Sequence, residues 1–407
     1  MNAKEMMNIL EETAYVRTSG TEAELRCAEY IREKVKSYGL QAELQPFAVP
    51  MAKIQEAVLT VDGVEYPCKG YFCAGSWDVE APLYYLRHND EIGLRECRGK
   101  IVLLDTFVGY WMYQDLLKYG AVGYITCNGN VYYPDRDIDQ KEQRSFVHKG
   151  NRMPAVNIHS TDAIEIVRKR GKTAHIRLFQ EEWEGQSNNV ILNIPGEVEE
   201  YICFTAHYDS THLSVGTFDN MSGAVGLLYL AEYFAKHPQH YSLRFIWCGS
   251  EERGLLGAKN YCSHGDWIAK CVLNINLDMI GSLMGKFITC VTADEKVRHY
   301  ICALSEELGF SNKVYEGIYS SDSTPFADKG IPAVSFARNP VPSMFGYHDR
   351  RDTIDIMDGD QMMDDFEFVL AFAKRMAGSK HIPFAREIPE NVRTKLDHYL
   401  GIKRSEK

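Results

Sequence analysis

Two adjacent acidic residues, Glu251 and Glu252, directly follow a short apolar run that ends in Cys248, Gly249 and Ser250. A run of this length and composition is typical of a buried strand. Carboxylates at the end of a buried strand are costly to desolvate, and a bound cation is the usual compensation. The pair therefore predicts a metal site in which one carboxylate binds an ion while its neighbour handles protons.

Further residues of metal-binding type stand where strand-like segments end or in loops. His207 ends YICFTAH, Asp219 lies in GTFDNMSG, Asp278 ends VLNINLD and His348 lies in GYHDRRDT. The carboxyl ends of parallel strands meet at one edge of an open α/β sheet, where sites form. These residues should therefore converge on one crevice.

The charges of this set favour two divalent ions. Asp219, Glu252 and Asp278 supply three negative charges, and the two imidazoles are neutral ligands. Two divalent ions bring four positive charges, so one remains, which a bridging hydroxide cancels. Imidazole with carboxylate suits zinc, with cobalt or manganese as substitutes. Two ions about 3.5–4 Å apart can share one carboxylate and one water.

The elements along the chain indicate a catalytic domain interrupted by an insertion. Residues 21–38 predict an amphipathic helix. From about residue 47 short strand-like pieces predominate, with one helical piece at 113–119. After an acidic junction at 181–184, strands and helices alternate, which predicts an α/β fold: a mostly parallel mixed sheet covered by helices on both faces. We expect the catalytic domain at 1–46 and 186–407, and an inserted β-rich domain at 47–185.

The bulk composition narrows the partners and the compartment. The 407 residues are 45% hydrophobic and 25% charged, with a formal net charge of -11, so we expect no nucleic-acid and no membrane partner. The N-terminal stretch lacks the apolar region of a signal peptide, and no run of about 18 apolar residues occurs. The spacing of the eleven cysteines does not suggest the disulfide framework of a small secreted domain. This favours reduced, buried thiols and a cytoplasmic location.

Five segments resemble those of a known enzyme family. AHYDS, FDNMSGAVG, CGSEERGLLGA, NLDMIG and YHDRRDT are similar to segments of the co-catalytic two-zinc aminopeptidases, metallopeptidase family twenty-eight. The resemblance covers about residues 186–380 specifically and the N-terminal helix loosely. The stretch GKIVLLD…GAVGYIT…MPAVNIHSTDA is similar to the protease-associated domain often inserted in these enzymes. The implied fold is that of the zinc exopeptidases, with an inserted protease-associated domain.

The resemblance implies a division of the metal ligands. One zinc ion would be bound by His207 and Asp278, and a second by Glu252 and His348. Asp219 would bridge the two ions, and the Asp219–Asn220 peptide is typically cis in this family.

The resemblance also implies three catalytic roles. Glu251 would be the general base, which takes a proton from the bridging water and passes it to the leaving amine. Asp209 would hold the second ring nitrogen of His207. Tyr347 matches the family position whose hydroxyl stabilises the tetrahedral oxyanion. The implied activity is hydrolysis of the N-terminal peptide bond of peptides by a metal-dependent aminopeptidase.

Other interpretations stay open at this point. A carboxypeptidase of the glutamate carboxypeptidase type carries a similar insertion and uses arginines for the substrate carboxylate, for which Arg136, Arg144 and Arg152 are candidates. A glutaminyl cyclase-like acyltransferase works with one zinc ion. A non-catalytic relative would have lost ligands, and all five are present here. Taken alone, Asp219 could be a helix N-cap and Asp209 a loop cap.

Overall fold

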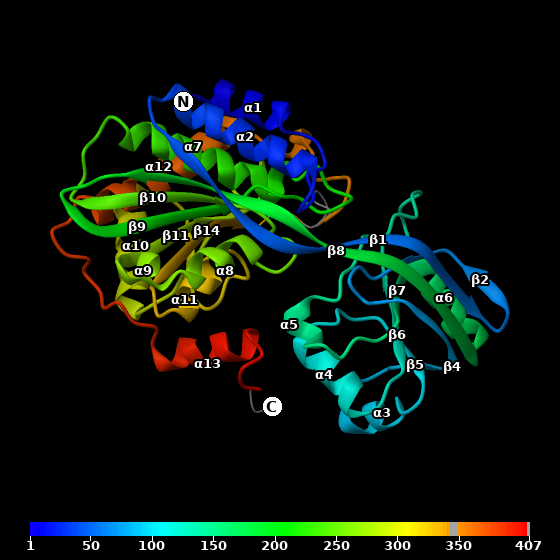
Figure 1. The fold of residues 1–407 in the computed structure, drawn as a ribbon. Coiled ribbons are helices and arrows are strands. Elements are labelled where there is room, and N and C mark those ends of the chain that lie inside the picture. The colour runs from blue at the N-terminus through cyan, green and yellow to red at the C-terminus, as the bar shows by residue number, and fades with distance from the viewer. Residues whose placement is uncertain (340, 342–347, 405–407) are drawn as a thin grey trace. The chain divides into compact units, whose positions relative to one another are not determined.

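The computed structural model describes residues 1–339, 341 and 348–404 (Figure 1). The chain divides into two compact units: unit 1 comprises Met1–Val49 and Gln186–Lys407, and unit 2 comprises Pro50–Gly185. The sequence predicts domain boundaries at 46/47 and 185/186, and the two units divide at 49/50 and 185/186. Because unit 1 takes chain from both sides of unit 2, residues near position 20 and residues near position 250 belong to the same unit.

Unit 1 is built on a mixed sheet with the strand order β13-β12-β14-β11-β9-β10-β8. The central strands β14, β11, β9 and β10 run parallel to one another, and β12 pairs with β13 in parallel. The pairs β12–β14 and β10–β8 are antiparallel. The predicted mostly parallel mixed sheet is confirmed. Its strands are β8 (Thr173–Ile194), β9 (Val198–His207), β10 (Tyr241–Cys248), β11 (Cys271–Leu277), β12 (Lys286–Thr292), β13 (Lys313–Glu316) and β14 (Ala333–Asn339).

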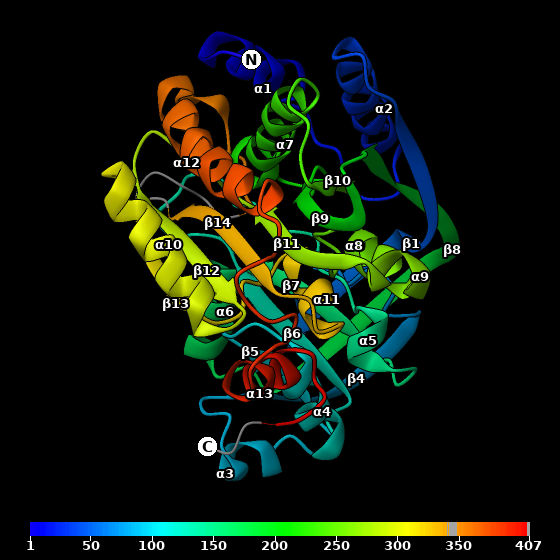
Figure 2. The same cartoon turned by 90° about the vertical axis from the view of Figure 1, so that its left-hand side faces the viewer.

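Helices cover both faces of this sheet, as Figures 1 and 2 show for α7 and α12 on one side and α8 and α11 on the other. The two faces bury separate clusters of apolar side chains. The predicted helix at 21–38 is α2, which begins at Glu22, and Thr21 caps it by accepting the N–H of Glu24. The helices of the first face are α1 (Ala3–Glu12), α2 (Glu22–Ser37), α7 (Ser222–Phe234), α10 (Glu295–Leu308) and α12 (Gly359–Ala377). The helices of the second face are α8 (Leu256–Ser263), α9 (Gly265–Ala269) and α11 (Ser323–Asp328). The unit also contains the short helices η1 (Thr217–Met221) and η2 (Ile354–Ile356), and the helix α13 (Glu390–Tyr399).

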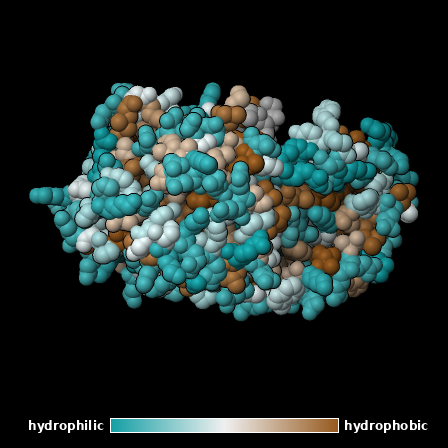
Figure 3. Space-filling view, turned by 90° about the horizontal axis from the view of Figure 1, so that it is seen from above, coloured by the Kyte–Doolittle hydropathy of each residue, from teal (hydrophilic) through white to brown (hydrophobic). Residues whose placement is uncertain are grey.

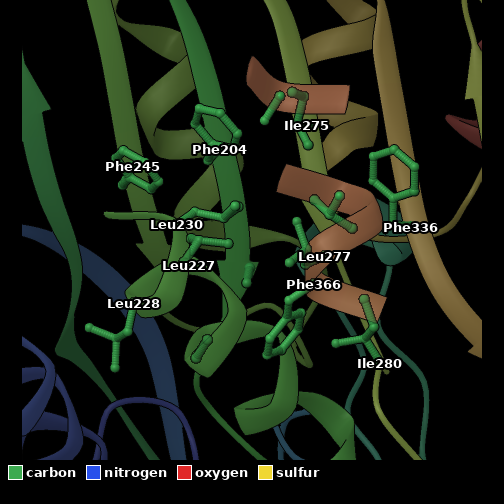
Figure 4. Close-up of a cluster of buried hydrophobic side chains, with 14 of the residues drawn as sticks. Phe204, Leu227, Leu228, Leu230, Phe245, Ile275, Leu277, Ile280, Phe336 and Phe366 are labelled. Atoms are coloured by element: carbon green, nitrogen blue, oxygen red, sulfur yellow. The ribbon is translucent and has the colours of Figure 1, made fainter. Parts of the chain in front are cut away.

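The larger apolar cluster fixes the strands that end at the site. Phe204 of β9 and Phe245 of β10 stack with ring centroids 4.6 Å apart, and Figure 4 shows them beside Leu227 and Leu230 of α7. Alternate residues of the same strands, such as Cys203, face the other cluster. Each fully buried side chain of this size contributes about 1.5–3 kcal/mol. A slip of one residue would exchange the two faces, so the packing sets which residue ends each strand.

Unit 2 has its own apolar core around the parallel strands β4, β5, β6 and β7, with β3 antiparallel to β7. The helix expected at 113–119 is α4, but the unit contains further helices that the sequence analysis did not predict, including α6 with the buried Ile166. The long strands β1 and β8 each begin in one unit and end in the other. The elements are β1 (Ala42–Val61), β2 (Val64–Tyr66), β3 (Cys68–Gly70), β4 (Trp77–Tyr85), α3 (Glu91–Arg95), β5 (Ile101–Leu104), α4 (Tyr110–Lys118), β6 (Gly123–Asn128), α5 (Ser145–His148), β7 (Ala155–His159) and α6 (Ser160–Lys169).

The surface is predominantly polar on the face drawn in Figure 3, where hydrophobic residues occur in small groups. Among the described residues, no helix combines the length and the apolar character needed to cross a membrane.

Candidate active site

The candidate site lies at the carboxyl ends of three neighbouring strands. His207 is the last residue of β9, Glu251 and Glu252 follow β10, and Asp278 directly follows β11. Strand β9 lies between β10 and β11 and is parallel to both, so the chain leaves β9 to one side and later returns on the other. Such a switch point opens a crevice at the strand ends.

Asp219 connects the two histidines. It lies in η1, immediately before α7, and the Asp219–Asn220 peptide is cis, as the resemblance implied. One carboxylate oxygen, Oδ1, lies 3.2 Å from Nε2 of His207, and the other, Oδ2, lies 3.3 Å from Nε2 of His348. A single side chain thus faces both imidazoles.

The surrounding carboxylates complete two groups of metal-binding type. His207, Asp219 and Asp278 form one, and Asp219, Glu252 and His348 form the other, with the ligand atoms of each group within 4.8 Å of one another. Nε2 of His207 lies 3.7 Å from Asp278, and Nε2 of His348 lies 3.1 Å from Glu252. The structure brings all five expected ligands together, with Asp219 common to both groups.

The donor set fits divalent cations. Asp219 and Asp278 are only 5% and 4% exposed, and Oδ2 of Asp219 and Oδ1 of Asp278 have no hydrogen-bond donor. A buried carboxylate oxygen without a donor is strongly unfavourable unless a cation compensates it. Nitrogen and oxygen donors without sulfur, in groups of three, suit zinc with a further position left open. These residues therefore fit a pair of zinc-type ions.

Nearby carboxylates favour the protonated form of both imidazoles. Burial disfavours charge on His207, but Glu251 and the other nearby carboxylates outweigh it and raise the pKa of His207 well above its usual value. Burial also opposes charge on His348, and Glu252 and Asp219 raise its pKa in the same way. A metal ion would replace these protons, so its binding should release protons.

Glu251 lies beside the cluster with a carboxyl group suited to proton transfer. Its Oε2 lies 3.9 Å from Nε2 of His207, and its side chain is 11% exposed. Burial raises the pKa of Glu251 well above the usual value of a glutamate. A carboxyl group with a raised pKa is a stronger base than an ordinary carboxylate, which suits it to accept and return a proton.

Asp209 has more contacts than the sequence indicated. Its Oδ1 lies 3.4 Å from Nδ1 of His207, the nitrogen opposite the one that faces Asp219. Its carboxylate also accepts the backbone N–H groups of Glu251 at 2.9 Å and Glu252 at 3.2 Å. One fully buried side chain therefore connects the imidazole to the two glutamates that follow β10.

Two residues that the sequence analysis missed support the expected ligands. Asn220 donates from Nδ2 to the carbonyl of Leu277 at 2.9 Å and accepts the N–H of Met279 at 3.0 Å, so it holds the backbone on both sides of Asp278. Asp352 accepts the N–H of Asp219 at 3.0 Å. The signal for both was available, since each lies in a motif that carries a ligand.

Other sequence-predicted residues stand apart from the cluster. Tyr347, expected to stabilise the oxyanion, lies outside the described residues. Arg136 forms an ion pair with Asp162, and Arg152 pairs with Glu182 at 2.7 Å, all within unit 2. These two guanidinium groups already have carboxylate partners, which weakens their candidacy for a substrate carboxylate.

Similarity to known proteins agrees with this geometry. Residues 189–373 match the model of peptidase family M28. The aminopeptidase YwaD of Bacillus subtilis is 27% identical over 354 residues, which span 80% of this chain and 73% of that protein. The aminopeptidase from Aneurinibacillus sp. strain AM-1 superposes with a TM-score of 0.74 at 25% identity, covering 94% of this chain and 97% of that one. BSAP, a zinc aminopeptidase from Bacillus subtilis, superposes with a TM-score of 0.76 at 24% identity, covering 96% of this chain and 98% of that one. At this identity the similarity concerns the fold alone.

The family match coincides with the segment that holds the candidate site. It begins in β8, ends in α12 and includes every expected ligand from His207 to His348. Residues 189–373 of this chain are therefore similar to peptidase family M28 over the whole segment that holds the candidate site.

Proposed function

We propose that this protein is an aminopeptidase that uses two zinc ions to hydrolyse the first peptide bond of peptides with a free N-terminus. The observation that carries the proposal is Asp219, whose two oxygens lie 3.2 Å and 3.3 Å from the imidazoles of His207 and His348. A carboxylate shared in this way suits two ions about 3.5–4 Å apart. The family match and the aminopeptidase YwaD support the same reaction.

The proposed ligands divide into two sets around the shared carboxylate. His207 and Asp278 would hold one ion, Glu252 and His348 the other, and Asp219 both. Bound zinc supplies Lewis acidity, which polarises a carbonyl and acidifies water.

Glu251 is the proposed general base. Its position beside His207, 3.9 Å from Nε2, supports a role in taking a proton from the attacking water and returning it to the leaving amine. Asp209 is the proposed orienting partner of His207, and its 3.4 Å approach to Nδ1 supports this. Tyr347 is the proposed donor to the oxyanion, a role supported by its place beside His348 in the sequence.

The proposed substrate group is the ammonium of a free N-terminus. Asp219, Glu251, Glu252 and Asp278 gather acidic oxygens at one end of the sheet. Carboxylate oxygens accept hydrogen bonds from an ammonium group, and such charge-assisted bonds are among the strong ones. The free amine of a peptide would therefore be drawn to the same place as the scissile bond that follows it.

Turnover of free and blocked substrates tests the proposal. Zinc-loaded protein is given a panel of fluorogenic aminoacyl amides and the same compounds with an acetylated amine. Release from the free-amine compounds alone is expected. Amino-blocked peptides with a free C-terminus are tested beside them, and release of their C-terminal residue would show a carboxypeptidase instead. A peptide that begins with glutamine is also tested, and closure of the glutamine ring without hydrolysis would show a cyclase.

The proposed location is the cytoplasm. All eleven cysteines are free thiols, and eight of them are buried. Reduced thiols persist in compartments kept reducing by glutathione and thioredoxin. Cell fractionation with an antibody to the chain tests this, and recovery outside the cytoplasmic fraction would contradict it.

A further inference from the structure

A buried glutamate of helix α2, Glu24, reaches the turn that leads to Glu251 and Glu252. Glu24 lies in the first turn of α2, is 1% exposed and belongs to the part of unit 1 that precedes the inserted unit. It lies outside residues 189–373, where the chain matches the family. Its carboxylate therefore reaches the site from a segment that the family match does not include.

The contacts of Glu24 are directed at the residue before Glu251. Oε1 accepts the backbone N–H of Ser250 at 3.0 Å, the hydroxyl of Ser250 at 3.3 Å and that of Ser187 at 2.8 Å. Oε2 accepts the N–H of Gly20 at 2.7 Å. Both oxygens are thus satisfied, and two of the four bonds end on Ser250.

Ser250 has a backbone conformation that needs support. Its φ is +57°, in the left-handed region that a non-glycine residue adopts at a cost of about 1–2 kcal/mol. The next two N–H groups, of Glu251 and Glu252, point to Asp209. Three consecutive N–H groups therefore donate to two buried carboxylates, Glu24 from the N-terminal segment and Asp209 from the loop after β9.

The close packing leaves this turn little freedom. A Cβ at Gly249 would lie 3.1 Å from Oε1 of Glu24, 2.6 Å from Oγ of Ser187 and 2.5 Å from the carbonyl of Asn188. The turn that leads to Glu251 is enclosed on the side of Glu24. A side chain in that position controls the direction in which the chain leaves β10.

We infer that Glu24 is a positioning residue of the active site: by holding the Ser250 turn, it fixes the direction of Glu251 and Glu252. The inference rests on the proposed function, because it assigns Glu24 to the same hydrolytic site. Residues that orient metal ligands from outside the ligand set are typically worth about 10–100-fold in activity or metal affinity.

The test compares two replacements of similar size that differ in the acceptor. In Glu24→Gln the amide oxygen still accepts the Ser250 N–H, whereas in Glu24→Met no acceptor remains. With zinc-loaded protein we expect kcat to fall about 10–100-fold in Glu24→Met, with KM within about threefold and an altered pH profile of kcat/KM. Glu24→Gln should keep most of the activity. The control is Glu22→Met, the same replacement at an exposed position in the same helical turn.

A second variant separates positioning from packing of α2. Glycine adopts φ near +57° without strain, so adding Ser250→Gly to Glu24→Met should recover much of the lost kcat. A loss of helix packing would not be recovered in this way. If Glu24→Met does not fold, Glu24→Ala replaces it in the same comparison.

The outcomes distinguish this inference from the proposed function. Equal kcat and equal pH profiles in Glu24→Met, Glu24→Gln and Glu22→Met would overturn the inference while leaving the aminopeptidase intact. If wild-type protein hydrolyses no aminoacyl substrate, the proposed function fails and zinc affinity decides the inference. Competition with a chromogenic chelator should then show at least about tenfold weaker zinc binding in Glu24→Met than in Glu24→Gln, and equal affinities would overturn it.

Discussion

Both units have parallel strands whose carboxyl ends carry polar residues, but the hydrogen-bond partners of those residues differ between the two units. In unit 2, Asp105 follows β5 and accepts the hydroxyl of Tyr85 at 2.6 Å, and Asn128 at the end of β6 accepts the amide of Asn157 at 2.7 Å. In unit 1, buried oxygens of Asp219 and Asp278 face imidazoles without a donor of their own. Among the described residues, the groups of metal-binding type all belong to unit 1. A parallel edge is therefore insufficient for a site, and the gathering of several groups of metal-binding type distinguishes the two.

Metal removal should give the largest difference between the units. Chelation of zinc-loaded protein should abolish turnover, and added zinc should restore it, because the proposed site depends on the ions. In scanning calorimetry, zinc should raise the unfolding transition of unit 1, since a ligand stabilises the state that binds it. The predicted difference between the units would be wrong if zinc raised the unfolding transitions of both units equally. It would also be wrong if turnover survived chelation.

Replacement of the proposed base should give the next largest effect. In Glu251→Gln we expect kcat to fall by about 10²–10⁴-fold, the usual contribution of a positioned general base, while zinc content stays at the wild-type level. The matched control is Asp105→Asn at the end of β5 in unit 2, which should leave kcat unchanged. Steady-state kinetics with metal analysis makes both measurements, and an active Glu251→Gln enzyme would exclude the assigned role.

Alanine variants of two buried asparagines, one in each unit, should give effects of intermediate size. Asn220 bonds the backbone on both sides of Asp278, and Asn157 connects Asn128 to the carbonyl of Asp139. Both side chains are fully buried, so either alanine variant should lose about 1–3 kcal/mol of unfolding free energy. Asn220→Ala alone should also lower kcat, by about 10–100-fold. Similar kinetics in the two variants would show that the bracing of Asp278 has no catalytic consequence.

A pH dependence of stability is expected from Glu24. Burial, with a contribution from Asp209, raises the pKa of Glu24 from 4.5 to about 8. Between these values the folded state holds a proton that the unfolded state releases, so stability should decrease as pH rises from about 4.5 to about 8, by up to about 1.4 kcal/mol per pH unit. Below this window both states are protonated and the contribution is constant.

Glu24→Gln removes that titration. Chemical unfolding of metal-free protein at pH 5 and pH 8 should show a smaller loss of stability in Glu24→Gln than in wild type. Glu22→Gln, at an exposed position, should follow wild type. An equal pH dependence in all three proteins would assign the slope to other groups.

Local patterns were enough for the elements that carry the site. The apolar run before Glu251 predicted β10, and Thr21 predicted the start of α2, because strand burial and helix capping are properties of neighbouring residues. The helix α6 was missed because its ten residues stand between two strand-like segments and give a short periodic signal. The meeting of His207 with Asp278 followed from the rule that sites form at strand ends, and Asp219 was added as a residue of a nearby loop.

Contacts across long separations in sequence were not predictable in this way. Glu24 and Ser250 are 226 positions apart, and no spacing within either segment indicates that they meet. The contact depends on how α2 packs against the sheet, which the sequence pattern leaves undetermined. Asp209 was assigned to His207 by resemblance, but its bonds to the two glutamate N–H groups appear only in three dimensions.

The discontinuity of unit 1 has a consequence for biosynthesis. Its first part, Met1–Val49, leaves the ribosome before the whole of Pro50–Gly185, and its second part follows. Domains generally fold as units during synthesis, so the inserted unit is complete while the peptidase half is still missing most of its sheet. His348 emerges last of the expected ligands. A nascent chain of this protein therefore cannot gather all five expected ligands until His348 has been made, after the whole of the inserted unit.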